Sequence, residues 1–235
     1  MVNNSRFSII LVESALESLE FIATTTSSRN LSRKIQKYRA KFPKKTILDV
    51  SIHSHLMQDL IDRNKRGRPD IIQTSLLLAL GSRLNKEGHL QIYVHTRNDE
   101  IITFNPQVRI PRNYNRFIGL IEQLFEIKTI TTDSQQILIS ISSKTLEDLL
   151  HSIKPTLTIL FTENGLVENR NNLQESFSEQ EHIVILIGGF PHGDFNPKTF
   201  ALTDSKVSIY PQPLDTLVVV SYAISVAEQA LGMNG

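Results

Sequence analysis

Two stretches of this 235-residue chain combine residue types and spacings that suit chemistry. In Arg68-Pro69-Asp70 a guanidinium and a carboxylate stand two positions apart and could be held beside a phosphate-bearing substrate. In IGGFPHGDF, residues 187–195, three glycines follow an apolar run. Glycine has no Cβ, so main-chain N–H and C=O groups there can contact a bound molecule. A tight strand-to-loop turn without a ligand explains the glycines equally well.

The Arg68-Pro69-Asp70 stretch also has a purely structural interpretation. Proline suits the first turn of the helix expected to follow, and Asp70 beside it favours the positive end of the helix dipole. Pairing with Arg68 is a second structural role for the Asp70 carboxylate. The sequence leaves these roles and a catalytic one open.

Charge is distributed unevenly along the chain. Residues 1–155 hold 22 Lys and Arg against 15 Asp and Glu, whereas the rest holds 3 against 9. An excess of cations of this kind suits a polyanionic partner. One basic run covers residues 29–45 without an acid, and contact with a nucleic-acid backbone competes there with a solvated helix face. Another includes Arg109, Arg112 and Arg116, of which the last two share one face if a helix begins after Pro111.

Composition and motifs exclude several classes of function. The absence of cysteine excludes disulfides, thiolate zinc sites and a cysteine nucleophile. No apolar run approaches about 18 residues and no signal peptide is recognisable, so we expect a cytoplasmic protein without a membrane partner. The chain lacks GxGxxG, GxxxxGK[ST], GxSxG and HExxH. His53 and His55 lack a third ligand at convincing spacing, so we predict no metal site.

The elements that must position these residues form an α/β pattern. Short apolar segments alternate with helical ones, which predicts a parallel sheet. Ligands in such sheets gather outside the carboxyl ends of the strands, where the glycine stretch lies. Strands are expected at 7–12, 47–50, 90–96, 100–104, 136–141, 156–161, 183–187 and 206–210. Helices are expected from Leu16 to Ile22 and over 56–61, from Pro69 to about 80, from after Pro111 to about 125, over 146–151 and over 214–231, with loop over 24–30.

The final helix is apolar over most of its circumference, which predicts burial against another surface such as a second subunit. Thr162 to Gly165, the glycine stretch and Pro211-Gln212-Pro213 are the turns that end the last three strands. These observations predict a glycine-lined pocket and a basic half, but they do not name a reaction.

Four motifs in order resemble the Nep/EMG family of ribosome-biogenesis proteins, which are pseudouridine N1-methyltransferases of the SPOUT class. They are KRGRPDI at 65–71, RIPRNYNRFIGLIEQL at 109–124, IGGFPHGDF at 187–195 and SIYPQPLD at 208–215. The opening IILVESALE and LDVSIHSHLM at 48–57 fit as well, so the resemblance covers nearly the whole chain and favours the archaeal type.

The resemblance implies a single SPOUT domain over residues 1–235, with a hairpin and helix extension at about 90–142 and a deep trefoil knot within about 155–235. It implies S-adenosylmethionine as cofactor, small-subunit rRNA as substrate and a homodimer formed through the knot region, and it admits ribosomal assembly proteins as further partners. The cofactor-binding residues that it implies are Leu160, Thr162, Gly188, Gly189, Gly193, Ser208, Ile209, Tyr210, Pro211 and Leu214.

On the substrate side the resemblance implies RNA contacts by Arg66, Arg68, Arg109, Arg112 and Arg116. Asp70, with Arg68, is the candidate catalytic group, because N1 of pseudouridine carries a proton that must leave and a carboxylate could accept it or orient the base edge. Tyr114 and Phe117 could stack on bases or pack in the interior. A non-catalytic rRNA-binding assembly factor and a SPOUT enzyme acting on tRNA or on a 2′-hydroxyl remain alternatives.

Overall fold

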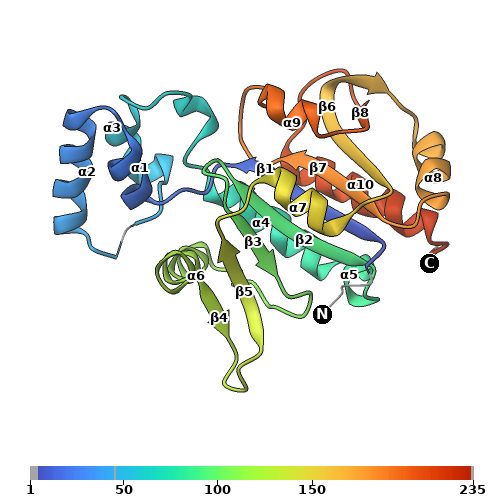
Figure 1. Ribbon diagram of the computed structural model, residues 1–235, viewed down its shortest axis with the longest axis horizontal. Helices are drawn as coiled ribbons and strands as arrows, with labels where there is room; N and C mark the ends of the chain where they lie inside the picture. Colours follow the sequence, from blue (N-terminus) through green and yellow to red (C-terminus); the bar gives the residue numbers. More distant parts are fainter. Residues whose placement is uncertain (1–4, 45, 234–235) are drawn as a thin grey trace.

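The computed structural model describes residues 5–44 and 46–233; Lys45, the last cation of the basic run, lies outside them. One eight-stranded sheet runs through the described part, with helices on both faces (Figure 1). Its strands are β1 (Phe7–Ser14), β2 (Leu90–Thr96), β3 (Ile101–Phe104), β4 (Thr129–Thr131), β5 (Ile137–Ser142), β6 (Leu157–Val167), β7 (Ile183–Gly188) and β8 (Ser205–Ser208).

The strand order is β4-β5-β3-β2-β1-β7-β6-β8. The last five strands of that order run parallel to one another, whereas β3, β4 and β5 pair antiparallel. The predicted α/β class with a parallel sheet is therefore confirmed, as is the hairpin of β2 and β3. The helices are α1 (Leu19–Thr25), α2 (Arg29–Lys41), α3 (Val50–Met57), the 3₁₀ turn η1 (Arg63–Lys65), α4 (Pro69–Gly81), α5 (Arg83–Lys86), α6 (Tyr114–Ile127), α7 (Leu146–Ile153), α8 (Arg170–Ser178), α9 (Pro197–Ala201) and α10 (Thr216–Ala230).

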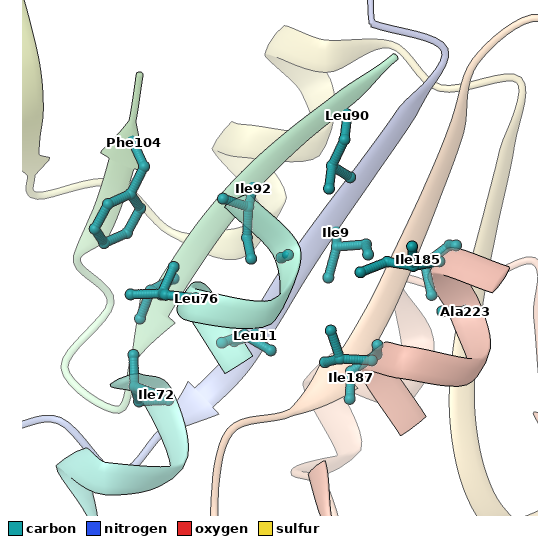
Figure 2. Packing of buried hydrophobic residues seen from close by; sticks show 14 of the residues in the cluster. Ile9, Leu11, Ile72, Leu76, Leu90, Ile92, Phe104, Ile185, Ile187 and Ala223 are labelled. Carbon is teal, nitrogen blue, oxygen red and sulfur yellow. The ribbon is translucent and has the colours of Figure 1, made fainter. Parts of the chain in front are cut away.

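The central strands are buried on both faces because their residues are apolar without interruption. Side chains alternate between faces, so Ile9, Leu11 and Ile185 pack with Ala223 of α10 and Leu76 of α4 (Figure 2). The intervening residues of β1 and β7, such as Ile10 and Leu186, face α7 and Phe200 of α9. A third cluster of buried residues lies among α1, α2 and α3, which form a lobe at one end of the molecule (Figure 1). Among the described residues, no helix is long and apolar enough to cross a membrane.

Several sequence-based expectations at the N-terminal lobe were wrong. Residues 47–50 are not a strand: Ile47 makes only an isolated bridge to Ser18, and Asp49 caps α3, its carboxylate accepting from the Ser51 N–H at 2.8 Å. This cap starts the helix at Val50, six residues before the predicted start, so His53 and His55 lie on a helix. The described residues contain no cluster of three or more potential metal ligands. The loop expected over 24–30 is shorter, because α1 reaches Thr25 and Ser28 caps α2.

The expected turn at Thr162 to Gly165 was also wrong. β6 continues to Val167 and pairs with β8, with a register shift between Phe161 and Leu166. Phe161 and Leu166 both pair with Val207, so residues 162–165 are extended without a partner in β8, and pairing resumes at Leu166.

The ends of β1 and β7 meet at Gly189. Its N–H donates to the Val12 carbonyl at 2.9 Å, and its carbonyl accepts from the Ala15 N–H at 2.8 Å. A Cβ built on Gly189 would lie 2.3 Å from Ser14 Oγ and 3.0 Å from Ile72 Cδ1. Only glycine allows this approach. Ala15 then connects the junction to α4, because its carbonyl accepts from the Arg68 N–H at 3.2 Å and so fixes the start of that helix.

We expect Gly189→Ala to lower the free energy of unfolding by about 1–3 kcal/mol, because the added methyl group overpacks a junction of three segments. Urea denaturation measures this change. Gly119→Ala is the matched control: Gly119 lies within α6 and its Cβ would meet no atom within 4 Å, so helix propensity predicts no loss of stability. Equal stability of the two variants would contradict the close packing at Gly189.

Candidate active site

A cavity of about 200 Å³ opens at the carboxyl ends of β6, β7 and β8, where ligands bind in parallel sheets. It is lined by residues within these three strands, by the segments that follow β7 and β8, and by the start of α10. They are Phe161, Thr162, Glu163, Ile187, Gly188, Phe190, Pro191, His192, Gly193, Phe195, Val207, Ile209, Tyr210, Gln212, Pro213, Leu214, Thr216 and Val219.

Six of the ten predicted cofactor residues line this cavity: Thr162, Gly188, Gly193, Ile209, Tyr210 and Leu214. The other four lie behind or beside it. Leu160 is fully buried in the sheet core, and Gly189 is at the junction of β1 and β7. Ser208 is buried and its hydroxyl donates to the Tyr210 carbonyl at 2.9 Å, so it shapes the turn after β8. Pro211 belongs to the same turn without lining the cavity.

The lining suits the adenosyl donor that the resemblance implies. Ile187, Val207 and Val219 provide apolar surface for an adenine or an alkyl chain, and Thr162 and Gln212 provide polar groups. A Cβ on Gly188 would meet the rings of Phe190 and Phe195 at 3.1–3.2 Å, so the glycine keeps space beside them. Gly193 has φ +93°, which side chains rarely adopt and which turns the loop around the opening.

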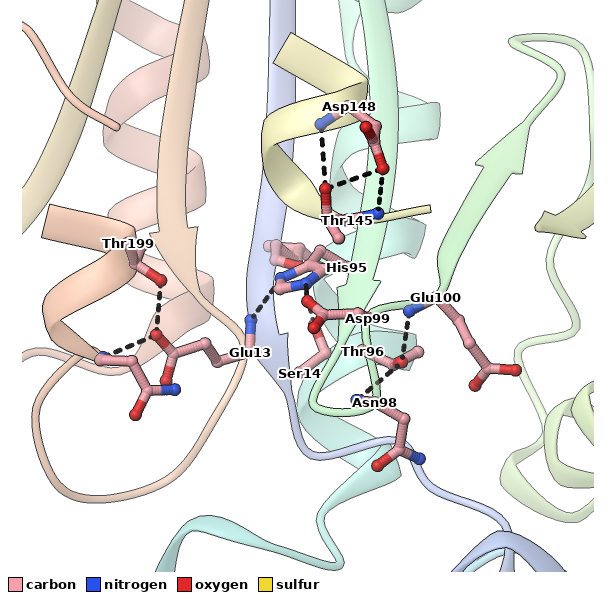
Figure 3. Close-up of polar contacts among 12 residues, drawn as sticks. Glu13, Ser14, His95, Thr96, Asn98, Asp99, Glu100, Thr145, Asp148 and Thr199 are labelled. Atoms are coloured by element: carbon pink, nitrogen blue, oxygen red, sulfur yellow. Dashed lines mark hydrogen bonds and ion pairs between the residues drawn. The ribbon is translucent and has the colours of Figure 1, made fainter. Parts of the chain in front are cut away.

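One wall of the cavity, the loop from Phe190 to Asn196, is held by residues that the sequence had not singled out. The carboxylate of Glu13, 2% exposed, accepts from the Asn196 N–H and the Thr199 hydroxyl, both at 2.7 Å (Figure 3). Its other oxygen accepts from Lys65 Nζ at 3.0 Å. Lys65 also donates to the Asp194 carbonyl, and its ammonium lies 4.1 Å from the centroid of the Phe190 ring.

The sequence carried only a weak signal for this clamp. Glu13 is a charged residue directly after a buried strand, and Lys65 opens the KRGRPDI motif. Glu13 adopts a positive φ of 51°, and its N–H donates to His95 Nδ1 at 3.4 Å. His95 Nε2 therefore carries the proton and donates to Asp99 at 3.0 Å (Figure 3).

Arg68 and Asp70 form a bidentate pair with both N–H···O distances at 2.8 Å. The pair is partly exposed, with side-chain exposures of 39% and 44%, and thus open to a substrate. The hydrogen bonds from Arg68 lower the pKa of Asp70, so this carboxylate is ionised and a weaker base than a free one. Asp70 likewise raises the pKa of Arg68, which also lies in the field of Asp215.

Asp215 connects this pair with the cavity. It precedes Thr216, whose hydroxyl donates to the Gly188 carbonyl at 2.7 Å inside the cavity. The start of α10 therefore contributes to the cavity and also acts electrostatically on Arg68. The predicted catalytic and cofactor-binding groups, 90 or more positions apart in sequence, are brought to one edge of the sheet.

Tyr114 has a polar role at the same place. Its hydroxyl donates to Asp49 at the start of α3, and burial together with this bond raises the pKa of Tyr114. Asp70 and Arg68 act electrostatically on the same hydroxyl. Tyr114 therefore ties the N-terminal lobe to α6 and to the Arg68–Asp70 pair, whereas Phe117 is buried in the core.

The five predicted RNA-binding arginines fall into three groups. Arg109, Arg112 and Arg116 are exposed, and within the described ranges none of them has an ion-pair partner. Arg68 is shared with Asp70. Arg66 is only 13% exposed and pairs with the fully buried Glu17. The expectation that Arg112 and Arg116 share a helix face was wrong, because Asn113 caps α6 and Arg112 precedes it.

Comparisons with known proteins identify the family of this chain. The family model for EMG1/NEP1 methyltransferase matches residues 9–228. Ribosomal RNA small subunit methyltransferase Nep1 of Staphylothermus marinus is 44% identical over 223 residues, covering 94% of each chain. The same-named protein of Pyrococcus furiosus is 41% identical, covering 93% of this chain and 95% of its own.

A solved structure with the same fold is Archaeoglobus fulgidus Nep1 bound to S-adenosylhomocysteine. It is 34% identical with a TM-score of 0.78, and the match covers 97% of this chain and 99% of that one. The agreement therefore extends over the whole sheet and not only over the motifs. With a family match from β1 to α10 and a cavity at the ends of the last three parallel strands, the chain belongs to the EMG1/NEP1 methyltransferase family.

Proposed function

We propose that this protein transfers a methyl group from S-adenosylmethionine to N1 of a pseudouridine in small-subunit rRNA, as a step in assembly of that subunit. The observation that carries the proposal is the glycine-bordered cavity adjoining an exposed Arg68–Asp70 pair. The names of the relatives support a small-subunit rRNA substrate, and the product-like ligand of the solved relative supports the cofactor. Action on ribosomal RNA would place the chain in the cytoplasm.

The cavity residues would hold the cofactor. Ile187, Val207 and Val219 offer apolar contacts, Thr162 and Gln212 offer polar ones, and the Lys65–Glu13 clamp keeps the loop after β7 in place. When bound there, S-adenosylmethionine would supply a methyl group bonded to a positively charged sulfur. The electron pair of the broken carbon–sulfur bond would stay on sulfur, and the N1 proton would pass to Asp70 as the new bond to N1 forms. The contribution of the chain is to hold the acceptor in line with the methyl carbon.

Arg68 and Asp70 would act on the acceptor base. Because Asp70 is held ionised by Arg68, we assign it to accepting a hydrogen bond from N1–H, which orients that edge of the base, and then to accepting the N1 proton as the methyl group is transferred. Arg109, Arg112 and Arg116 would bind phosphates and position the RNA, without reading its sequence. Arg66 is left out of this set because Glu17 already occupies its guanidinium in the interior.

We also propose a homodimer and a knotted C-terminal part over about 155–235. Leu166 and Val167 on β6 and Leu217 and Val218 on α10 are large apolar side chains with 40–76% exposure, which favours a partner surface. β8 pairs with β6 although β7 separates them in sequence, and the start of α10 bonds back to Gly188, as a knotted path would require. Light scattering that gives a monomer of 26.6 kDa would contradict the dimer.

The proposed activity is tested with two RNA stem-loops that differ only in carrying pseudouridine or uridine at the target position. We expect methyl transfer from labelled S-adenosylmethionine to the pseudouridine RNA alone, because N1 of uridine is its glycosidic nitrogen and cannot accept a methyl group. Equal labelling of both RNAs would contradict N1 specificity. Binding of the cofactor, measured by calorimetry, without any turnover would favour a non-catalytic assembly factor. Labelling of tRNA in place of the stem-loop would favour a SPOUT enzyme that acts on tRNA.

Asp70→Asn is expected to reduce kcat by about 10²–10⁴-fold with RNA binding retained, as for loss of a group that handles a proton. Asp133→Asn, in the exposed turn between β4 and β5, is the control and should leave the rate unchanged. Full methylation by Asp70→Asn would leave Asp70 with its pairing role only.

Arg68→Gln is expected to shift the acid limb of the pH–rate profile to higher pH. Arg68 lowers the pKa of Asp70, so the wild-type carboxylate stays ionised as pH falls, and without Arg68 protonation begins at higher pH. If the acid limb did not shift, ionisation of Asp70 would not be what determines it.

Lys65 is a positioning residue, and its test is a change in KM separate from kcat. Glu13→Gln/Lys65→Met removes both charges together, which avoids leaving one buried and unpaired. We expect KM for S-adenosylmethionine to rise roughly tenfold, about 1.4 kcal/mol, with kcat at saturation nearly unchanged. A lower melting temperature with unchanged KM would indicate a structural role alone.

A further inference from the structure

The basic run that the proposed function does not use lies mostly on α2, the outermost helix of the N-terminal lobe (Figure 1). Leu31 and Ile35 of α2 are buried against α1 and α3, and Tyr38 packs edge-on against His53 at 4.8 Å. The side of α2 that points away from these residues has no packing role. It carries Arg29, Asn30, Arg33, Gln36, Lys37, Ala40 and Lys41, all exposed.

The cations of α2 divide into two groups by their neighbours. Lys34 pairs with Asp59 at 2.8 Å and Arg39 pairs with Glu20 at 3.1 Å, so the charges of these two cations are neutralised by acidic residues of the protein. Arg29, Arg33, Lys37 and Lys41 have no acidic partner within residues 5–44 and 46–233. We call these four residues the α2 stripe.

The α2 stripe has a regular geometry. Its members are four positions apart, which advances the helix by roughly 6 Å and turns it by about 40° at each step. Like charges at this spacing repel one another, so the stripe costs stability unless a polyanion neutralises it. Its repetition along one edge suits a row of backbone phosphates better than a single anion.

We propose that the α2 stripe binds the phosphates of a double-stranded rRNA segment that flanks the target nucleotide. This inference rests on the proposed function. The lobe is joined to the site through Asp49 at the start of α3, which accepts a hydrogen bond from the Tyr114 hydroxyl and acts electrostatically on Arg68. RNA held at the Arg68–Asp70 pair therefore has α2 within reach of its neighbouring segment. An acidic protein fits less well, because this face of α2 has no aromatic or large apolar side chain to anchor a protein interface.

The test compares two double variants of α2 that change charge equally. Arg33→Gln/Lys37→Gln removes two stripe cations, and Lys34→Gln/Arg39→Gln, the matched control, removes two paired ones from the same helix. Binding of full-length protein is measured against salt with a short stem-loop that carries only the target, and with a longer RNA that adds the flanking duplex.

For the longer RNA, we expect the stripe variant to lose about two units of the slope of log K against log salt and roughly tenfold or more in affinity at 0.15 M salt. The control variant should keep the wild-type slope, since Lys34 and Arg39 are paired with Asp59 and Glu20 and are not free to neutralise phosphates. On the short stem-loop both variants should bind and methylate as wild type does. Equal slopes of the two variants on the longer RNA, or binding of an acidic polypeptide in its place, would overturn the proposal. Failure of the wild type to methylate the short RNA would instead count against the proposed function.

Discussion

The structure depends on the contact between the ends of two buried parallel strands. β1 and β7 lie side by side in the sheet centre, and Gly189, directly after β7, comes so close to Ser14 at the end of β1 that no Cβ fits between them. From this contact two chains of interaction lead to the site. Ala15 bonds to Gly189 and to Arg68, which fixes the start of α4, while Glu13 turns inward and bonds to the loop that walls the cavity. The cofactor side and the substrate side are therefore set by one junction.

Two buried ion pairs stabilise this junction in one arrangement. Glu13 and Glu17, both almost fully buried, pair with Lys65 and Arg66, which are adjacent in the chain. Withdrawing four charges from water is costly, so these pairs are better explained as determinants of geometry than as sources of stability. Gly67 has φ +67°, and its carbonyl accepts from the Val50 N–H at 2.9 Å; it reverses the direction of the chain. As a result Lys65 and Arg66 point inward, whereas Arg68 and Asp70 reach the surface.

This division explains how a short motif serves structure and chemistry together. Within KRGRPDI, the first two cations hold the cavity wall and the interior, the glycine turns the chain, and the last charged pair is open to a substrate. The same rule separates the cations of α2, of which two are neutralised by the lobe and four remain exposed. In both places the partner of a cation, and not its residue type, decides whether its charge is free to meet an external anion.

The sequence by itself determined the parallel sheet, because apolar runs such as residues 183–187 have one favourable environment, and the motifs in order determined the family. It also predicted a glycine-lined pocket, since a buried strand ending in glycines leaves main-chain groups accessible, and Gly188 and Gly193 do line a cavity. Only the tertiary structure decided that Glu13 and Lys65 hold the cavity wall, that Arg66 is internal, and that residues 47–50 lead into a capped helix. Those outcomes depend on partners 49 to 186 positions away, or on a cap that competes with strand propensity, and a charged residue does not reveal in sequence which opposite charge the fold will bring to it.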